Sequence, residues 1–362
     1  MLSESRSRLE HGVDTMSAQK EANPNRFYNP KLEDSEKALE ASLRPQNFGE
    51  FIGQKQTAEN LKVYVAAAKK RKESLDHVLL SGPPGLGKTT LATIIANEIN
   101  VQIKSTSGPV LERPGDLAGI LTSLTDGDVL FIDEIHRMPK IVEEYLYSAM
   151  EDYQINIVLD QGPSARSLKI PLSKFTLIGA TTREGLLTSA FRSRFGILEK
   201  LIFYPPEDIS AIIERSAKIL SIETEQEAVE LLSRRSRGTP RIANRLLARV
   251  RDVAQVKGKG KITKPLTELG LSMLGIDSEG LDATDRRILE VITSCGGGPV
   301  GLKTIAVSVG EEEDTIEDVY EPYLIQQGFL QKTLRGRTVS KKAFEHLKVE
   351  IPKDKQSDLF RQ

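Results

Sequence analysis

The sequence predicts an α/β fold in three parts: a large domain with a mainly parallel sheet, a small helical domain and a C-terminal winged-helix domain. Up to residue 204, short apolar runs of strand length alternate with stretches of helical periodicity, which is typical of a parallel sheet. Residues 207–274 show helical periodicity without a clear strand. The last part has three helix-like stretches and then a hairpin pattern, which is the outline of a winged helix.

The expected domain boundaries follow these changes of pattern. A chain of 362 residues should hold two or three domains at about 100–200 residues each. We expect a mobile leader over 1–24, a large domain over 25–204, the small helical domain over 205–275 and the winged-helix head over 278–362. Pro205-Pro206 would form a hinge, because proline restricts its own backbone and that of the residue before it.

Hydrophobic spacing predicts the individual elements of the large domain. Residues 57–72 carry apolar side chains at helical intervals. Three apolar runs, at 77–81, 129–132 and 175–180, fit strands that are buried on both faces. Residues 89–100 follow the first of these runs and are expected to form a helix.

Composition limits the cellular setting. No apolar run approaches the roughly 20 residues that cross a bilayer, and the first residues lack the apolar core of a signal peptide. A single cysteine, Cys295, cannot form an internal disulfide, so we expect a cytoplasmic protein that has no contact with membranes. The formal net charge of -1 taken alone argues against a nucleic-acid partner. However, residues 233–262 carry ten Lys and Arg and one acid, Asp252; the ordinary explanation for such a run is a solvated helix face.

The strongest motif is Gly82–Thr90, which fits the phosphate-loop pattern G-x-x-x-x-G-K-[ST] between a predicted strand and a predicted helix. Its glycines would let backbone N–H groups turn toward phosphate oxygens at a helix N-terminus. Lys88 would reach the β- and γ-phosphates, and the Thr89 hydroxyl would ligate Mg²⁺. The motif predicts ATP and Mg²⁺ as cofactors.

A second motif places two acids at the carboxyl end of a predicted strand, where ligands bind in open α/β sheets. Asp133 would hold Mg²⁺, and Glu134 would polarise the attacking water. Two acids after a strand are common, but after a phosphate loop they point to nucleotide hydrolysis.

Three further motifs have local sequences that leave their roles open. The Thr181-Thr182 pair ends the next predicted strand and could orient water, although such a pair is often only a turn or a cap. Arg192 and Arg194 could stabilise a transferring phosphate from a neighbouring subunit, or could be surface ion-pairing residues. Arg241 follows Gly-Thr-Pro at the start of a helix and could sense the nucleotide across the hinge.

Together these motifs resemble the AAA+ ATPases, and most closely the RuvB family of bacterial Holliday-junction branch-migration motors. The similarity runs from about Leu43 to about Leu347. The segments that carry it are Leu43–Pro45, Gly53-Gln54, Gly82–Thr90, Leu130–Arg137, Met150–Tyr153, Gly179–Arg183, Arg194–Gly196 and Gly238–Arg241. The resemblance implies a large ATPase domain, a helical lid and a winged-helix head, assembled as a hexameric ring around duplex DNA.

The resemblance also implies roles for single residues. Lys88, Asp133 and Glu134 match the catalytic positions, Thr181 or Thr182 matches sensor 1, Arg194 is the preferred trans-acting finger with Arg192 second, and Arg241 matches sensor 2. Positions that match nucleotide contacts are Leu43, Arg44, Gly85, Lys88, Thr89, Thr90, Glu151, Asp152, Tyr153, Arg194, Tyr204 and Arg241.

Two hairpins match the partner-binding segments of the family. The hairpin at 154–172 would dock onto the junction-binding partner RuvA, with the RuvC resolvase acting indirectly. Its apolar candidates are Ile155, Ile157, Leu159, Leu168 and Ile170, although a hairpin packed on its own domain is the plain alternative.

The C-terminal hairpin would be the wing that contacts DNA phosphates. Its basic candidates are Lys332, Arg335 and Arg337. The family has arginine at the position of Lys332, and lysine cannot make a bidentate phosphate contact.

The resulting expectation is an ATP-dependent DNA translocase for Holliday-junction branch migration in homologous recombination, DNA repair and the response to DNA damage. One alternative is another AAA+ DNA machine, such as a replication-initiator-like loader. A second is a winged-helix regulator that binds ATP only to sense it, although the paired acids and arginines argue against that.

Overall fold

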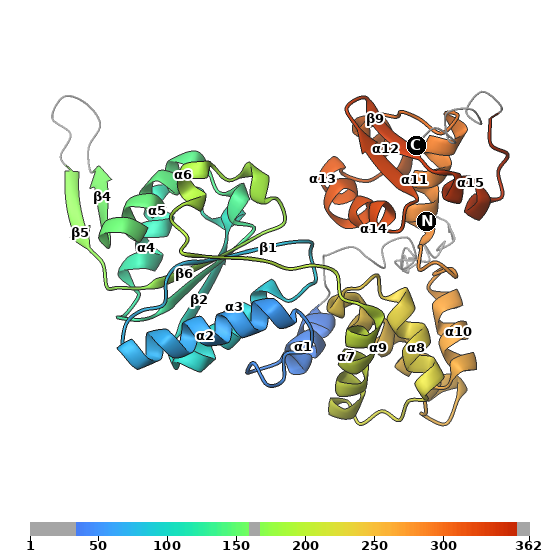
Figure 1. Ribbon diagram of the computed structural model, residues 1–362, viewed down its shortest axis with the longest axis horizontal. Helices are drawn as coiled ribbons and strands as arrows, with labels where there is room; N and C mark the ends of the chain where they lie inside the picture. The colour runs from blue at the N-terminus through green and yellow to red at the C-terminus, as the bar shows by residue number, and fades with distance from the viewer. Residues whose placement is uncertain (1–33, 159–166, 353–362) are drawn as a thin grey trace, which may run out of the picture.

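The computed structural model describes residues 34–158 and 167–352 of the chain (Figure 1). Within these residues, a five-stranded parallel sheet in the order β2-β3-β6-β1-β7 forms the centre of the large domain. Its strands are β1 (Val78–Ser81), β2 (Ile103–Ser107), β3 (Val129–Asp133), β6 (Thr176–Thr181) and β7 (Ile197–Lys200). The predicted mainly parallel sheet is therefore confirmed.

Side chains along the central strands point alternately into two apolar clusters, one on each face of the sheet. In β1, Val78 and Leu80 face the first cluster and Leu79 faces the second. The period of two arises because successive strand side chains point to opposite faces. Helices α2 (Lys55–Arg71) and α3 (Lys88–Ile99) cover one face, and α4 (Pro114–Thr122) and α5 (Lys140–Asp152) cover the other (Figure 1). This burial on both faces explains why the strands are near-continuous apolar runs.

Four helices form the lid after Pro205. They are α7 (Pro206–Ile219), α8 (Gln226–Arg235), α9 (Pro240–Lys257) and α10 (Lys264–Met273). The basic run 233–262 does not form one surface of this domain. Arg237 is buried and Arg241 points into a pocket, whereas Arg249 and Arg251 both pair with Asp252, at 3.1 and 3.3 Å.

The C-terminal head has the predicted winged-helix outline. Its helices are α11 (Ala283–Ser294), α12 (Leu302–Val309), α13 (Glu313–Thr315), the π-helical turn η5 (Ile316–Tyr320), α14 (Glu321–Gln326) and α15 (Lys341–Leu347). The wing consists of β8 (Leu330–Thr333) and β9 (Gly336–Val339), which pair antiparallel. None of the helices within 34–158 and 167–352 is long and apolar enough to cross a membrane.

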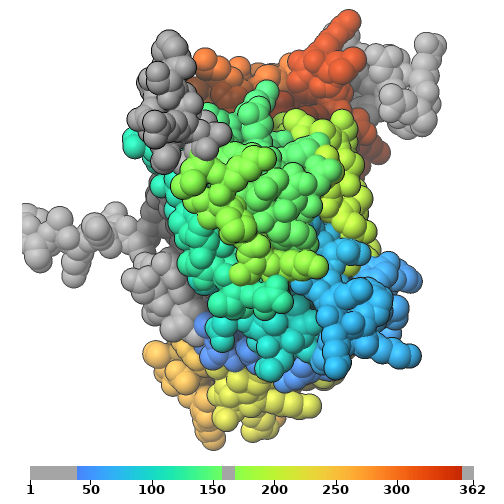
Figure 2. Space-filling model, turned by 90° about the vertical axis from the view of Figure 1, so that its left-hand side faces the viewer, coloured from blue at the N-terminus to red at the C-terminus, as the bar shows by residue number. Residues whose placement is uncertain are grey.

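Short elements complete the large domain, and two of them form a hairpin that projects from it (Figure 1). These elements are α1 (Asp34–Leu43), η2 (Gly108–Val110), η3 (Ile135–Arg137), β4 (Gln154–Val158), β5 (Ser167–Pro171), η4 (Glu184–Leu186) and α6 (Ser189–Arg192). Strands β4 and β5 pair antiparallel to form the projecting hairpin. Figure 2 shows the molecule from this side, with parts of the head above the large domain and of the lid below it.

The hairpin corrects part of the predicted partner surface. Ile155 is fully buried and packs in its own domain, and its cross-strand neighbour Ile170 is half-buried against the same cluster. The prediction of an exposed Ile155 is therefore wrong, because the base of the hairpin rests on the large domain. Leu168, which pairs with Ile157 one step further out, is 48% exposed. Leu159 lies outside the described residues.

Candidate nucleotide-binding site

The phosphate loop joins β1 to α3, and its three glycines, Gly82, Gly85 and Gly87, all have backbones that other residues rarely adopt. Gly82 has φ +136° and Gly85 has φ +80°. A side chain on Gly85 would also place its Cβ 3.2 Å from the Cβ of Arg241 in the lid. Glycine therefore allows the loop to turn and to lie against the lid. Lys88 begins α3, and its amine donates to the carbonyl oxygens of Gly82 and Pro83 at 2.7 and 2.9 Å.

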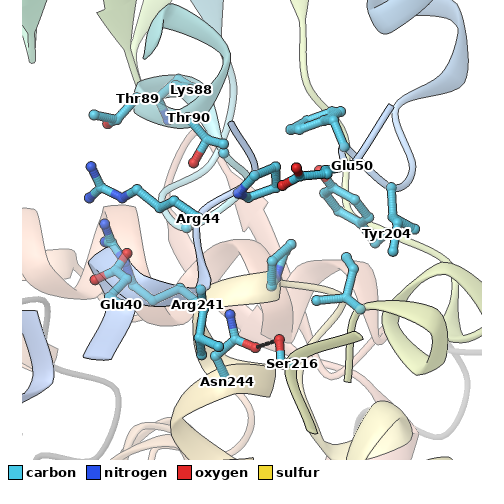
Figure 3. A pocket seen from close by; sticks show the side chains of 18 of the residues that line it. Glu40, Arg44, Glu50, Lys88, Thr89, Thr90, Tyr204, Ser216, Arg241 and Asn244 are labelled. Carbon is cyan, nitrogen blue, oxygen red and sulfur yellow. Dashed lines mark hydrogen bonds and ion pairs between the residues drawn. The ribbon is translucent and has the colours of Figure 1, made fainter. Parts of the chain in front are cut away.

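A pocket lies beside this loop, between the large domain and the lid. Figure 3 shows Thr89 and Thr90 at the start of α3 on one side, and Arg241 and Asn244 of α9 on the other. The predicted site residues that line the pocket are Leu43, Arg44, Gly85, Lys88, Thr89, Thr90, Asp133, Glu134, Tyr204 and Arg241. The pocket thus brings together residues from the N-terminal segment, the phosphate loop, β3 and the lid.

Tyr204 lines the pocket and connects the two domains. Its hydroxyl donates to the carbonyl of Leu86 at 3.1 Å, and its backbone N–H donates to the carbonyl of Gly238 at 2.8 Å. Burial raises the pKa of this tyrosine, which keeps the hydroxyl protonated and able to donate. The chain therefore enters the lid from a fixed point next to the phosphate loop.

The two acids occupy the end of β3 as expected. An oxygen of Asp133 accepts from the backbone N–H of Glu134 at 2.9 Å, and Glu134 has a left-handed backbone with φ 49°. Burial and the neighbouring Asp133 raise the pKa of Glu134, which makes its carboxylate a better proton acceptor. Burial lowers the pKa of Lys88 to about 8, and both acids oppose that shift. The arrangement is suited to binding phosphate and accepting a proton from water.

The two candidate sensor threonines have different surroundings. The Thr181 hydroxyl oxygen accepts from the backbone N–H of Arg183 at 3.0 Å and lies 2.9 Å from Nδ1 of His136. The hydroxyl oxygen of Thr182 is buried and has no hydrogen-bond partner among the described residues. Neither threonine lines the pocket itself.

Both candidate finger arginines lie away from this pocket. Arg194 pairs with Glu151 at 2.8 Å, and its guanidinium lies 4.5 Å from the ring centre of Tyr147. Arg192 is 3.8 Å from Glu184. Neither arginine is among the residues that line the pocket.

Glu151, Asp152 and Tyr153 also lie outside the pocket of their own chain. Tyr153 packs edge-on against Phe175, with ring centres 5.9 Å apart, just before β6 begins. The phosphate loop follows the opposite, carboxyl end of the parallel strands. The expectation that Glu151, Asp152 and Tyr153 line the nucleotide therefore does not hold for the nucleotide of the same chain.

The wing corrects one predicted DNA contact. Arg337 is 9% exposed, and its guanidinium donates to both carboxylate oxygens of Glu321, at 2.6 and 3.2 Å. A buried cation held by a carboxylate cannot reach a phosphate, so the prediction for Arg337 is wrong. Lys332 is half-exposed and pairs with Glu317, whereas Arg335 is exposed at the two-residue tip of the hairpin.

Several pocket residues from the lid and the N-terminal segment were not predicted from the sequence. Arg215 of α7 donates to the carbonyl of Leu43 at 2.8 Å and to Glu50 at 2.9 Å, while Ser216 donates to Asn244 at 2.8 Å. Asn244 could have been found, because it lies three residues after Arg241 on one face of a helix. Arg215 gave no such signal, since its partners lie more than 160 residues away.

Each of the three domains matches a domain of a known protein family. Residues 43–201 match the Holliday junction DNA helicase RuvB P-loop domain, residues 204–277 the RuvB AAA lid domain, and residues 278–348 the RuvB C-terminal winged helix domain.

Individual relatives are similar over most of the chain. The Holliday junction branch migration complex subunit RuvB of Myxococcus xanthus (strain DK1622) is 58% identical over 323 residues, which cover 89% of this chain and 94% of the relative. The solved structure of the Thermotoga maritima RuvB Holliday junction branch migration motor is 53% identical, with a TM-score of 0.80, over 86% of this chain and 100% of that one. The chain therefore belongs to the RuvB family of AAA+ ATPases.

Proposed function

We propose that the protein is the ATP-driven motor of Holliday-junction branch migration. The observation that carries this proposal is the pocket, in which the phosphate loop and its two acids face Arg241 of the lid. A nucleotide held there bridges two domains, so hydrolysis changes the contacts that set the angle between them. The winged-helix head, attached to the lid, then moves relative to the large domain.

Individual side chains divide the chemistry in the pocket. Lys88 holds the phosphates, and Thr89 with Asp133 fits Mg²⁺, which takes one or two protein ligands and keeps several waters. Bound Mg²⁺ supplies charge neutralisation for the phosphates. Glu134 orients the attacking water and accepts its proton. We assign the sensing hydroxyl to Thr182 rather than Thr181, because only the Thr182 hydroxyl lacks a partner among the described residues.

A ring of subunits supplies the residues that one chain lacks at its own pocket. Arg194 is 32% exposed beside Glu151, away from that pocket. A homohexamer in which each subunit presents this surface to the next would bring Arg194 toward the neighbour's γ-phosphate. Glu151, Asp152 and Tyr153 would meet the same nucleotide from that side.

Partner contacts are assigned to the outer hairpin and the wing. Leu168 projects beyond the buried base of the β4–β5 hairpin and suits an apolar contact with RuvA. RuvC would act on the same junction without direct contact. Arg335 at the wing tip suits a phosphate of duplex DNA, read without sequence preference. Chromosomal DNA as the substrate implies a cytoplasmic location.

The deciding experiment measures migration of a synthetic four-way junction with ATP and Mg²⁺, with and without RuvA. The wild-type chain should convert the junction to duplex products, and Lys88→Ala should not. Lys62→Ala is the matched control, because the Lys62 side chain is 40% exposed and pairs only with Glu59 on its own helix among the described residues. ATP hydrolysis without junction migration would favour another DNA machine, and no hydrolysis at all would favour a nucleotide-sensing regulator.

A further inference from the structure

The head contacts the large domain through Arg183, which follows the sensor threonines at the end of β6. Its Nε lies 2.7 Å from a carboxylate oxygen of Asp318, and its Nη2 lies 3.0 Å from Asp314 and 3.4 Å from Glu317. These three acids belong to α13 and η5 of the head, which face the large domain (Figure 1). One arginine of the ATPase domain therefore holds three carboxylates of another domain.

The acidic turn formed by Asp314, Glu317 and Asp318 is itself fixed to the wing. Glu317 directs Oε2 toward Arg183, while its Oε1 pairs with Lys332 of β8 and lies 3.4 Å from Arg337 of β9. The wing cations hold Glu317 in place within the head. A displacement of the head must therefore move the carboxylates that Arg183 contacts.

On its other side, Arg183 is linked to the catalytic carboxylate. Its backbone N–H donates to the Thr181 hydroxyl oxygen at 3.0 Å, and that oxygen lies 2.9 Å from Nδ1 of His136. If the Thr181 hydroxyl donates its proton to Nδ1, a neutral imidazole carries its own proton on Nε2. This Nε2 lies 3.4 Å from the carboxylate of Glu134. A continuous line of polar contacts thus runs from Glu134 to Arg183.

The charged residues of the head also affect His136 in this line of contacts. Burial lowers the pKa of His136; the carboxylates of Asp318 and Asp314 oppose the shift, while Arg183 and Arg137 reinforce it. The His136 side chain is 4% exposed, and Asp318 and Arg183 are only 26% and 23% exposed, so solvent screens these two charges less than it screens Asp314, which is 69% exposed. The head is therefore electrostatically connected to the site as well as in contact with it.

The head also moves with the lid, because Arg237 of the lid and Asp285 of α11 form a buried ion pair. The aromatic ring of Tyr323 lies against the same guanidinium, 4.9 Å from it. A lid that closes on nucleotide through Arg241 would carry the acidic turn with it. Movement of the lid would then displace the carboxylates that contact Arg183.

We propose that Arg183 is a positioning residue for ATP hydrolysis, which transmits the docked position of the head to Glu134 through Thr181 and His136. Arg183 does not line the nucleotide pocket. It acts on the rate of the chemical step through the orientation of Glu134, and not on nucleotide affinity. The inference rests on the proposed ATPase activity and adds the control of that activity by the head.

The test is a double-mutant cycle across the domain contact in the full-length chain. Arg183→Gln, Asp318→Asn and the double variant are compared by steady-state ATP hydrolysis. Each single variant should lower kcat about tenfold, and the double variant should also lower it about tenfold, because both changes break one linkage. KM for ATP should stay within about twofold of wild type. Arg183→Lys, which keeps the cation, should recover part of the lost kcat.

Glu313→Gln is the matched control, because Glu313 is exposed on the same turn and has no ion pair among the described residues. It should hydrolyse ATP like the wild type, and circular dichroism should report a folded chain for every variant. An unchanged kcat, a raised KM or fully additive losses would each overturn the inference. A wild-type chain without ATPase activity would instead overturn the proposed function.

Discussion

Replacement of Arg237 by alanine should destabilise the joint between lid and head more than any surface substitution. The Arg237 guanidinium pairs with both carboxylate oxygens of Asp285, and its Nε donates to the carbonyl of Gly280 at 3.2 Å. The two side chains are 2% and 0% exposed. The backbone at this position is left-handed, with φ 56°. Because arginine and alanine both carry a Cβ, the substitution does not change the strain of that conformation.

The magnitude follows from the charge that is left behind. Without Arg237, the Asp285 carboxylate stays buried with only the backbone N–H of Asp282, at 2.9 Å, as a described donor. Removing one partner of a buried ion pair costs about 3–5 kcal/mol, because the other charge is then uncompensated. We therefore expect Arg237→Ala to lower the free energy of unfolding by about that amount.

The assay is urea unfolding followed by far-ultraviolet circular dichroism, because the chain has no tryptophan. Lys264→Ala is the control, since Lys264 pairs with Glu227 at 3.1 Å on the surface, where the side chains are 51% and 70% exposed. Such exposed pairs contribute about 0–1 kcal/mol. If Arg237→Ala lost no more stability than Lys264→Ala, the buried ion pair would not hold lid and head together as described.

The same variant should show a defined pH dependence. Burial raises the pKa of Asp285, and Arg237 opposes that shift, so removing Arg237 raises the pKa further. A group whose pKa is higher in the folded than in the unfolded state stabilises the fold fully below its unfolded pKa and less as pH rises. Because the pKa of Asp285 in the wild type is about 8, the deficit of Arg237→Ala should be largest above pH 8 and should shrink as the pH falls to about 8. A deficit that grows toward acid pH would contradict this account.

Three further predictions address the proposed motor. Glu134→Gln should lower ATP hydrolysis by at least about 100-fold and leave nucleotide binding nearly unchanged, measured with a fluorescent nucleotide; loss of binding would show that Glu134 holds the nucleotide instead. Arg194→Ala should be inactive alone and regain activity when mixed with Lys88→Ala, because mixed rings contain some pockets with both residues intact; mixtures without any recovery would exclude a finger supplied in trans. Leu168→Asp should weaken RuvA binding by about tenfold or more without changing thermal unfolding, and unaltered binding in a titration would remove the hairpin from the proposed interface.

Sequence patterns alone were enough to predict the fold class, the phosphate loop and the two acids at the end of β3. These features are local: a glycine-rich turn between a strand and a helix has one workable geometry, and strand residues buried on both faces must be apolar. Lys88 and Asp133 also come together predictably, because parallel strands bring their carboxyl ends to one edge of the sheet. The positions of Arg44, Tyr204 and Arg241 around the pocket followed from the family resemblance.

Whether the other motif residues are accessible depends on how the folded domains pack. Arg337 and Ile155 fit the sequence patterns of a DNA contact and a partner contact, but Glu321 and the large domain bury them. The link from Arg183 to the acidic turn joins residues more than 130 positions apart. Local patterns report the character of a side chain, whereas its exposure and partners depend on how separate domains pack, and no local signal specifies that packing.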